Sequence, residues 1–335
     1  MGIDVDVMPV FIEDNYFSNI ITNNTVMRDL FEDIRMLAAY DCPVLITGET
    51  GTGKELLARA VHDLSLRGGD YLPVNVGAVD DTFFSDLLFG HTKGAFTGAN
   101  DERQGMLACA VEGTLFLDEI GELSDASQIK LLRVIENREY YQIGANKLCH
   151  SNARLVMATN VDPTGEEQPK KFREDLYHRL KPYHLRIPPL RERLDDLPLL
   201  LDHFIRKSAD ELGKARPRYT GELLELLNNY AFPGNVRELQ GMVKAALLRH
   251  KGGLLSTSVF KKLMIPGCNL PDGKVDSAWI SSISELPTFD EINNLLLTEA
   301  LRRSDNNQSV AATMLGVSAS AVSQRLSRIK KKMEE

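Results

Sequence analysis

A glycine-rich string in the first quarter of the chain has the residue types needed to hold a polyphosphate. It fits the pattern GxxxxGK with Gly48, Glu49, Thr50, Gly51, Thr52, Gly53 and Lys54. Glycines let backbone N–H groups point at phosphate oxygens, a following helix adds partial positive charge, and Lys54 neutralises the terminal phosphates. The next residue is Glu55, where the generic pattern has a Ser or Thr for Mg²⁺. A purely structural glycine turn is the alternative, but the strand-loop-helix setting favours a phosphate site.

Two adjacent carboxylates follow an apolar run further along the chain. Residues 113–117, Gly-Thr-Leu-Phe-Leu, lead directly into Asp118 and Glu119. At the carboxyl end of a strand, one carboxylate can hold Mg²⁺ while the next polarises water, so we assign Asp118 to the metal and Glu119 to the general base. An isolated Asp-Glu pair is more often a solvated loop. Its occurrence together with the Lys54 string favours phosphate chemistry.

A third string, between the first two, places an aromatic residue among small ones. It consists of Gly94, Ala95, Phe96, Thr97, Gly98 and Ala99. With a glycine hinge on each side, the pattern predicts a mobile loop whose tip exposes Phe96. The alternative is a turn whose phenylalanine packs inward.

These three strings need a sheet that brings them to one edge. Between residues 43 and 187, short apolar runs alternate with amphipathic stretches, which predicts α/β architecture: a parallel sheet with helices on both faces. The expected strands are 43–47, 71–75, 114–118, 155–159 and 183–187. Each is bounded by Gly, Asn, Asp or Pro, as is typical where functional loops leave the carboxyl ends of strands.

Periodicity and composition divide the chain into five segments. Helical spacing replaces strand patterns near residue 191, and residues 265–287 hold three Pro, two Gly and four Ser with no sustained period. We expect a short N-terminal extension (1–15), an α/β subdomain (16–190), a small all-helical lid subdomain (191–264), a linker (265–287) and a helix-turn-helix domain (288–335).

The last segment has the spacing of a helix-turn-helix. Ala312, Gly316 and Val322 fall where the helices cross, in the turn and under the second helix. Seven Lys or Arg stand against one acid between residues 302 and 333, about +6 in a chain of net charge −8, which suits DNA phosphate contacts. A small bundle for protein contacts is the alternative. An earlier helix is expected to have one apolar face formed by Ile292, Leu295, Leu296, Ala300 and Leu301.

Composition excludes several classes of protein. The 335 residues are 43% hydrophobic and 26% charged, which excludes disordered and collagen-like chains. No apolar run reaches the roughly 18–20 residues of a membrane span, and the first residues are acidic, so we expect a cytoplasmic protein with no membrane partner. Four cysteines and seven histidines are scattered without metal-ligand or disulfide spacing, and the histidines are interpreted as ordinary core or surface residues.

Together the three strings resemble the central AAA+ domain of the bacterial enhancer-binding proteins, the activators of sigma-54 RNA polymerase. The resemblance covers residues 16–250 and includes the whole string GETGTGKE, so Glu55 is the usual residue in that family. It implies an ATPase that uses ATP and Mg²⁺, assembles from dimers into a hexamer, and presents the 94–99 loop to sigma-54 polymerase, with Phe96 and Thr97 as principal contacts. Residues 137–152 are similar to the family's second surface loop.

The resemblance also implies roles for single residues. Asn75 is similar to the residue that holds the catalytic Glu119 away from water, and Thr159 with Asn160 resembles the sensor of the γ-phosphate. Arg173 and Arg179 resemble the arginine fingers that reach the neighbouring subunit's nucleotide. For any one arginine alone, a surface salt bridge would be the better interpretation.

Arg237, in the string Pro-Gly-Asn-Val-Arg-Glu-Leu, resembles the second sensor of the family. The C-terminal segment resembles the Fis-type domain that ends these activators and binds double-stranded DNA upstream of the promoter. The base-side contacts expected from this resemblance are Ser320, Ser323, Gln324 and Arg325, with Arg328 towards phosphate.

Three functions are compatible with these patterns. The first is a sigma-54 activator, the second a nucleotide-binding DNA-binding regulator (a repressor or conventional activator) that does not engage sigma-54, and the third an AAA+ remodeller of another target, such as a chelatase or helicase loader. The intact 94–99 string favours the first over the second, and the helix-turn-helix speaks against the third. Since about 20 residues precede the AAA+ segment, control by a regulatory partner acting in trans, by expression level or by a co-activator is expected.

Overall fold

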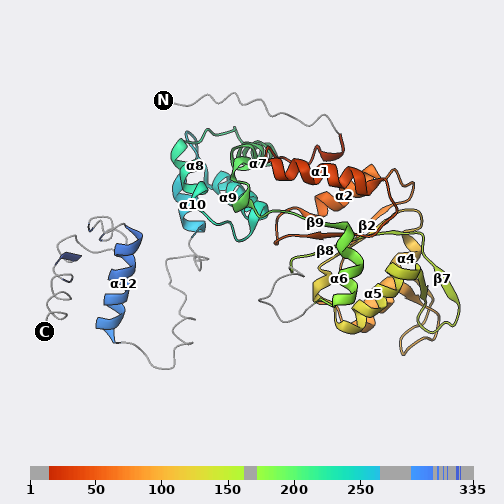
Figure 1. The fold of residues 1–335 in the computed structure, drawn as a ribbon. Helices are drawn as coiled ribbons and strands as arrows, with labels where there is room; N and C mark the ends of the chain where they lie inside the picture. Colours follow the sequence, from red (N-terminus) through yellow and green to blue (C-terminus); the bar gives the residue numbers. More distant parts are fainter. Residues whose placement is uncertain are drawn as a thin grey trace. The chain divides into compact units, whose positions relative to one another are not determined.

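A computed structural model of the chain describes residues 15–161, 172–264 and 288–304, together with positions 308, 312, 315, 322, 323 and 325. The chain divides into two compact units, residues 1–266 and 267–335, and each is described by itself (Figure 1).

The first unit is built on a parallel sheet of five strands. Their order is β2 (Tyr71–Asn75), β5 (Thr114–Asp118), β8 (Arg154–Thr159), β1 (Val44–Thr47) and β9 (His184–Arg186). Every neighbouring pair is parallel, so all five carboxyl ends lie at the same edge. This arrangement confirms the α/β prediction, and the expected strands at 71–75 and 114–118 match residue for residue.

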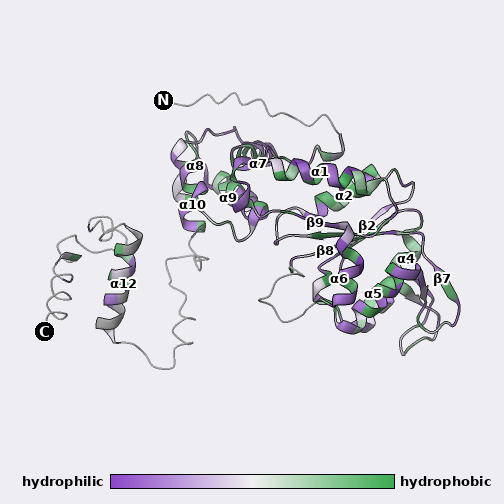
Figure 2. Ribbon diagram, in the orientation of Figure 1, coloured by the Kyte–Doolittle hydropathy of each residue, from purple (hydrophilic) through white to green (hydrophobic). Residues whose placement is uncertain are grey.

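Alternate residues of the central strands face two separate hydrophobic cores. On β1, Val44 and Ile46 pack with α1 (Thr25–Ala38) and α2 (Lys54–Leu64), while Leu45 packs with the opposite layer. That layer contains α3 (Asp81–Phe89), α4 (Met106–Cys109), α5 (Asp125–Asn137) and α6 (Glu174–Leu180). Figures 1 and 2 show the helices on both sides of the sheet, each with hydrophilic and hydrophobic stretches. Because successive side chains of a strand point to opposite faces of the sheet, one strand contributes residues to both cores.

After β9, helices form the rest of the first unit. After the short 3-10 turns Leu190–Glu192 and Leu194–Asp196 come α7 (Leu197–Leu212), α8 (Gly221–Asn228), α9 (Asn235–Arg249) and α10 (Thr257–Leu263). They enclose a core of their own, with residues such as Phe204, Leu239 and Phe260 fully or almost fully buried. We call this helical part the lid.

Two small antiparallel hairpins project from the first unit. One pairs β3 (Gly90–His91) with β4 (Arg103–Gln104), and the other pairs β6 (Glu139–Tyr141) with β7 (Leu148–His150). Sequence analysis expected only a surface loop over residues 137–152. Strands of two or three residues are too short to leave a readable alternation, which is why they were not predicted.

The second unit contains α12 (Phe289–Arg303), and the positions described after residue 304 are all helical. Leu297 is buried with Ala312 and Val322, which supports helices crossing at these positions. The expected apolar face needs a correction, because Leu296 is 53% exposed and the neighbouring Leu297 is only 2% exposed. Neighbouring helical residues differ by about 100° in direction, so Leu297 takes the place of Leu296 on this face. Ala300 is buried and Leu301 packs against the same cluster, as expected. Gly316 and the side chains of Ile292 and Leu295 lie outside the described residues.

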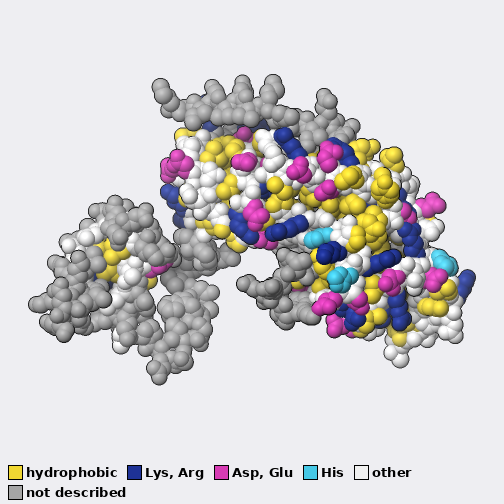
Figure 3. Space-filling model, in the orientation of Figure 1, with side chains coloured by type: hydrophobic (Ala, Val, Ile, Leu, Met, Phe, Trp, Pro, Cys, Tyr) yellow, Lys and Arg dark blue, Asp and Glu magenta, His cyan; other side chains and the backbone are white. Residues whose placement is uncertain are grey.

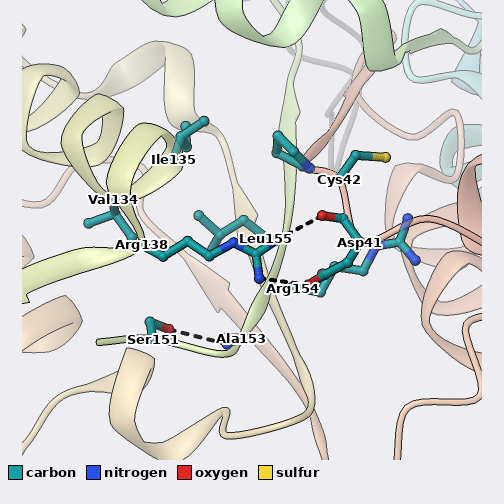
Figure 4. Close-up of a pocket in the computed structure, with 10 residues that line it drawn as sticks. Asp41, Cys42, Val134, Ile135, Arg138, Ser151, Ala153, Arg154 and Leu155 are labelled. Carbon is teal, nitrogen blue, oxygen red and sulfur yellow. Dashed lines mark hydrogen bonds and ion pairs between the residues drawn. The ribbon is translucent and has the colours of Figure 1, made fainter. Parts of the chain in front are cut away.

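A small cavity lies at the opposite edge of the sheet, where β1 and β8 begin (Figure 4). Its volume is about 30 Å³, the share of one water molecule in the liquid and far too little for a nucleotide. Arg138 spans it to Asp41, and the buried Arg154 donates to the carbonyls of Leu37 and Ala38 at the end of α1. We therefore interpret this cavity as structural.

Within the described residues, no helix is long and apolar enough to cross a membrane. The same residues contain no group of three or more His, Cys, Asp or Glu arranged to hold a metal ion.

Candidate active site

The glycine-rich string joins the carboxyl end of β1 to the first residue of α2. Gly51 and Gly53 have positive φ angles of 81° and 106°, a region that L residues with a Cβ rarely adopt. Lys54, the first residue of α2, donates from Nζ to the carbonyl oxygens of Gly48 at 2.8 Å and Glu49 at 3.3 Å. The loop thus folds round its own lysine in front of a helix N-terminus, the arrangement that binds phosphate.

Charges from three elements act on Lys54. Burial lowers the pKa of its ammonium group from 10.5, the carboxylates of Asp118 and Glu119 act to raise it, and Arg237 acts to lower it further. The sheet and the lid therefore bring both carboxylates and Arg237 within electrostatic range of the same ammonium group.

Asp118, Glu119 and Asn75 gather at the ends of two neighbouring strands. Asn75 pairs with Asp118 in the β2–β5 register. Glu119 has a left-handed backbone (φ 63°), and its N–H donates to Asp118 Oδ1 at 2.9 Å. A Cβ built on Gly77 would lie 2.2 Å from Glu119 Oε2 and 3.0 Å from Asn75 Oδ1. The glycine leaves room for Glu119 beside Asn75, whose Oδ1 accepts from Gly77 N at 2.8 Å.

Thr159 and Asn160 follow on the next strand. Thr159 is fully buried and in register with Thr47, and its carbonyl accepts from Gly48 N at 3.3 Å. Its hydroxyl accepts from Val161 N at 3.1 Å, while Asn160 is exposed at the strand end. The sheet therefore brings the proposed sensor beside the phosphate loop.

The two proposed arginine fingers lie on or beside α6. Arg173 forms a bidentate ion pair with Asp175, at 2.8 and 3.1 Å, and Arg179 is exposed in the last turn. Arg237 differs from them, because its backbone N–H donates to Gly51 O at 3.3 Å. The lid thus holds Arg237 at the phosphate loop of its own chain.

Asn235, which sequence analysis did not select, joins the lid to the phosphate loop. It is fully buried at the start of α9, with a positive φ of 51°. Its Nδ2 donates to Glu49 Oε2 at 3.0 Å and Thr50 O at 3.1 Å, and its Oδ1 accepts from Leu190 N at 2.8 Å. The string Pro-Gly-Asn before a helix was the available signal, since Asn favours helix starts and tolerates left-handed backbone.

Two further arginines connect the lid to this loop. Arg191 makes a bidentate pair with Glu49, at 2.6 and 2.8 Å, which lowers the pKa of that carboxyl. Arg193, 3% exposed, donates to Thr52 O at 3.0 Å and lies 3.7 Å from the fully buried Asp196. Sequence analysis could not find these contacts, because their partners are about 140 positions apart in the chain.

The 94–99 loop leaves the hairpin of β3 and β4. Gly94 N donates to Ala99 O at 2.8 Å, and Ala99 N donates to Phe96 O at 3.0 Å, so the loop closes on itself. Thr97 is exposed, and the Phe96 side chain is 39% exposed with its ring against His91. The position of the Phe96 side chain is therefore intermediate between the two alternatives, a fully exposed tip and an inward-packed turn.

The proposed DNA contacts are only partly described. Ser323 and Arg325 are helical and exposed, as a DNA-facing helix surface would require. Ser320, Gln324 and Arg328 lie outside the described residues.

The five-stranded parallel sheet, the phosphate loop and the helical lid define an AAA+ ATPase. Comparison with protein-family models matches residues 20–186 to the sigma-54 interaction domain, residues 191–267 to the AAA+ ATPase lid domain, and residues 289–328 to the bacterial regulatory proteins of the Fis family. The chain belongs to the family of sigma-54-dependent transcriptional activators, with an ATPase domain and a Fis-type DNA-binding domain. This assignment favours the first of the three expected functions.

Curated relatives support the assignment over most of the chain. The regulatory protein AtoC of Escherichia coli K12 is 37% identical over 92% of this chain and 67% of its own length, and the response regulator protein PilR of Pseudomonas aeruginosa is 37% identical over 90% and 68%. Among solved structures, NtrX of Brucella abortus in complex with ADP is 26% identical with a TM-score of 0.66, covering 92% of this chain and 68% of its own.

Proposed function

We propose that the chain uses ATP hydrolysis to remodel the closed complex of sigma-54 RNA polymerase at promoters, after binding upstream DNA through its C-terminal unit. The observation that carries this proposal is the convergence at the carboxyl edge of the sheet of Asp118, Glu119 and Arg237, whose charges all act on the Lys54 ammonium group. The solved complex of NtrX with ATP, at 25% identity, supports ATP as the nucleotide. We infer a cytoplasmic location, where sigma-54 polymerase works.

The residues of the site divide the chemistry between them. Backbone N–H groups of residues 48–53 and the Lys54 ammonium would bind the phosphates. The Asp118 carboxylate offers the oxygen ligands that Mg²⁺ prefers, and the ion would neutralise phosphate charge when bound. Glu119 would take a proton from the attacking water, and its place beside Asn75 supports a resting position from which it is released. Thr159 and Asn160 would sense the γ-phosphate.

Oligomerisation would complete the site. Arg179 is exposed, and its forked guanidinium suits the charge that develops on a transferred phosphoryl group. We propose that Arg179 and Arg173 reach the nucleotide of a neighbouring subunit in a ring formed from dimers, for which Arg173 must leave its pair with Asp175. Arg237 would act within its own subunit, because the lid already holds it at Gly51.

The 94–99 loop would transmit the nucleotide state to sigma-54. Its exposed Phe96 and Thr97 offer an apolar and a hydroxyl contact on a hairpin that extends from the ATPase body. The DNA-binding helix would use Ser320, Ser323, Gln324, Arg325 and Arg328. A regulatory partner acting in trans is compatible with this arrangement.

Promoter opening by the purified protein, with sigma-54 polymerase and ATP, tests the proposal. Glu119→Gln should bind ATP but neither hydrolyse it nor open the promoter, because the general base is lost. Thr97→Ala should hydrolyse ATP at nearly the wild-type rate without opening the promoter. Thr82→Ala, an exposed threonine of α3, and Glu122→Gln, an exposed acid after β5, are matched controls and should behave as wild type. Normal opening by both test variants would refute the mechanism.

A further inference from the structure

His91 ties together three segments at the neck of the 94–99 loop. It is the last residue of β3 and is 9% exposed. Its Nδ1 is hydrogen-bonded to Asp86 Oδ1 on α3, and its Nε2 lies 3.0 Å from the carbonyl oxygen of Asp101, just before β4. The ring therefore spans the entry and the exit of the loop and fixes both to the helix beneath.

Both partners of the His91 ring are acceptors. A neutral imidazole has one N–H and can donate to only one of them, whereas the doubly protonated ring donates to both. Asp86 is 8% exposed, and its second oxygen accepts from Arg103 Nη1 of β4 at 3.0 Å. One buried carboxylate thus binds a side chain from each strand of the hairpin, His91 of β3 and Arg103 of β4.

The same imidazole contacts the aromatic residue of the loop. The ring centroids of His91 and Phe96 are 4.9 Å apart with an interplanar angle of 65°, an edge-on arrangement. Such aromatic pairs are attractive beyond their buried area. Part of the Phe96 surface is therefore covered by its own chain.

The backbone of the loop is held by its own hydrogen bonds, whereas the ring of Phe96 pairs with His91. Added Cβ atoms on Gly94 and Gly98 would meet nothing within 4 Å, so the backbone on either side of the tip is in open space. The neck, in contrast, is fixed on its other side: Thr92 N donates to Ile143 O at 3.0 Å and Ile143 N donates to Gly90 O at 2.9 Å. Because the neck is fixed and the backbone of the tip is closed by its own hydrogen bonds, the contact between His91 and Phe96 is the point at which the Phe96 ring is held or released.

We propose that His91 is a positioning residue that holds Phe96 folded back on the neck of the loop until sigma-54 competes for the ring. The inference rests on the proposed function, in which Phe96 contacts sigma-54. Because the covered part of Phe96 cannot contact His91 and a partner at once, the His91 contact lowers the affinity for sigma-54. Removing it should raise that affinity by roughly threefold to tenfold, the range of one aromatic contact.

Affinity for purified sigma-54 and ATPase kinetics of the full chain test this inference together. His91→Gln keeps a donor for one acceptor but loses the ring, and it should bind sigma-54 more tightly while kcat and KM for ATP stay within about twofold of wild type. His250→Gln, at the end of α9 in the lid, is the matched control and should change neither quantity. A purely structural role would weaken binding or leave it unchanged, so either result in a folded His91→Gln protein overturns the inference.

A second measurement does not depend on the folding of that variant. In the histidine-labelled wild-type chain, the NMR signals of the His91 ring should be displaced by the Phe96 ring current, and Phe96→Leu should remove the displacement. Saturating sigma-54 should move the wild-type signals to their positions in Phe96→Leu. Binding without that movement would overturn the inference, whereas a wild-type protein that neither binds sigma-54 nor opens the promoter would refute the proposed function instead.

Discussion

Lys54 carries a partly buried charge that lowers the stability of the protein when no nucleotide is bound. Its ammonium group is partly buried, which lowers its pKa from 10.5, although Asp118 and Glu119 favour the charge. Since the folded chain binds the proton less tightly than the unfolded chain, this residue opposes folding below its folded pKa. This destabilising contribution of Lys54 decreases as the pH rises from the folded pKa towards 10.5, the pKa in the unfolded chain. Nucleotide phosphates would supply the missing counter-charge.

This balance predicts separate effects of Lys54→Met on binding and stability. Without nucleotide, the loss of the bonds to Gly48 and Glu49 and the relief of the buried charge should nearly cancel, so the Tm should stay close to that of wild type. Adding ATP should raise the Tm of wild type but not that of the variant. Thermal unfolding at pH 7 and pH 9.5, each with and without ATP, checks this; wild type should gain stability relative to the variant at the higher pH. A large loss of stability in the variant without nucleotide would show that Lys54 is structural.

At the scale of elements, the joint between α9 and the phosphate loop depends on one side chain. Asn235 is fully buried and satisfies Leu190 N, Thr50 O and Glu49 with its amide group. Asn235→Ala would leave buried polar groups unpaired and place alanine at a φ of 51°. We expect the free energy of unfolding of the ATPase unit to fall by about 2–4 kcal/mol.

The same substitution should weaken ATP binding, because Arg237 is carried two residues further along α9. Asn229→Ala is the matched control: its exposed amide donates to Glu225 O at 2.8 Å, and the expected loss is about 0.5 kcal/mol or less. Urea unfolding followed by circular dichroism gives the stability, and ATP titration gives the affinity. Equal effects of the two substitutions would show that the joint does not depend on Asn235.

The elements also show what the sequence could reveal and what it could not. The strands at 71–75 and 114–118 were predictable because each is a short apolar run ended by a polar residue. The positions of Lys54, Asp118 and Thr159 at one edge followed from parallel strands. Asn235 and Glu49, in contrast, are 186 positions apart, and no local pattern reports such a pairing. Leu296 was placed one residue out of phase because adjacent leucines leave the helical face ambiguous.

Charge is organised at the scale of the whole molecule. The chain has a net charge of −8, yet residues 302–333 carry about +6, so the acidic excess belongs to the rest of the chain. On the visible face of the first unit, Lys and Arg side chains are interspersed with Asp and Glu (Figure 3). The positive charge is local, because the second compact unit as a whole, residues 267–335, carries eight Lys or Arg against nine Asp or Glu. A basic segment inside a nearly neutral unit is suited to local phosphate contacts.

The proposed ring predicts that ATPase activity depends on residues from two neighbouring subunits. Lys54→Met should lack a nucleotide site but keep Arg179, whereas Arg179→Ala should bind ATP with nearly wild-type affinity but lack the arginine supplied to its neighbour. Each variant alone should be inactive as an ATPase. In a head-to-tail ring assembled from an equal mixture, about a quarter of the interfaces combine an intact Lys54 with an intact Arg179, one from each parent.

Mixing the two variants should therefore restore up to about a quarter of the wild-type ATPase rate, measured by phosphate release against the total subunit concentration. Arg216→Ala, which removes an exposed lid arginine paired with Asp210, is the matched control. It should be an active ATPase alone, and a mixture with Lys54→Met should show no more activity than the Arg216→Ala subunits supply themselves. The recovery should disappear on dilution below the concentration at which rings assemble, because each subunit then returns to its own incomplete site. If the mixture stays inactive although mixed rings form, Arg179 acts within its own chain; a severe loss of ATP affinity in Arg179→Ala would point to the same conclusion.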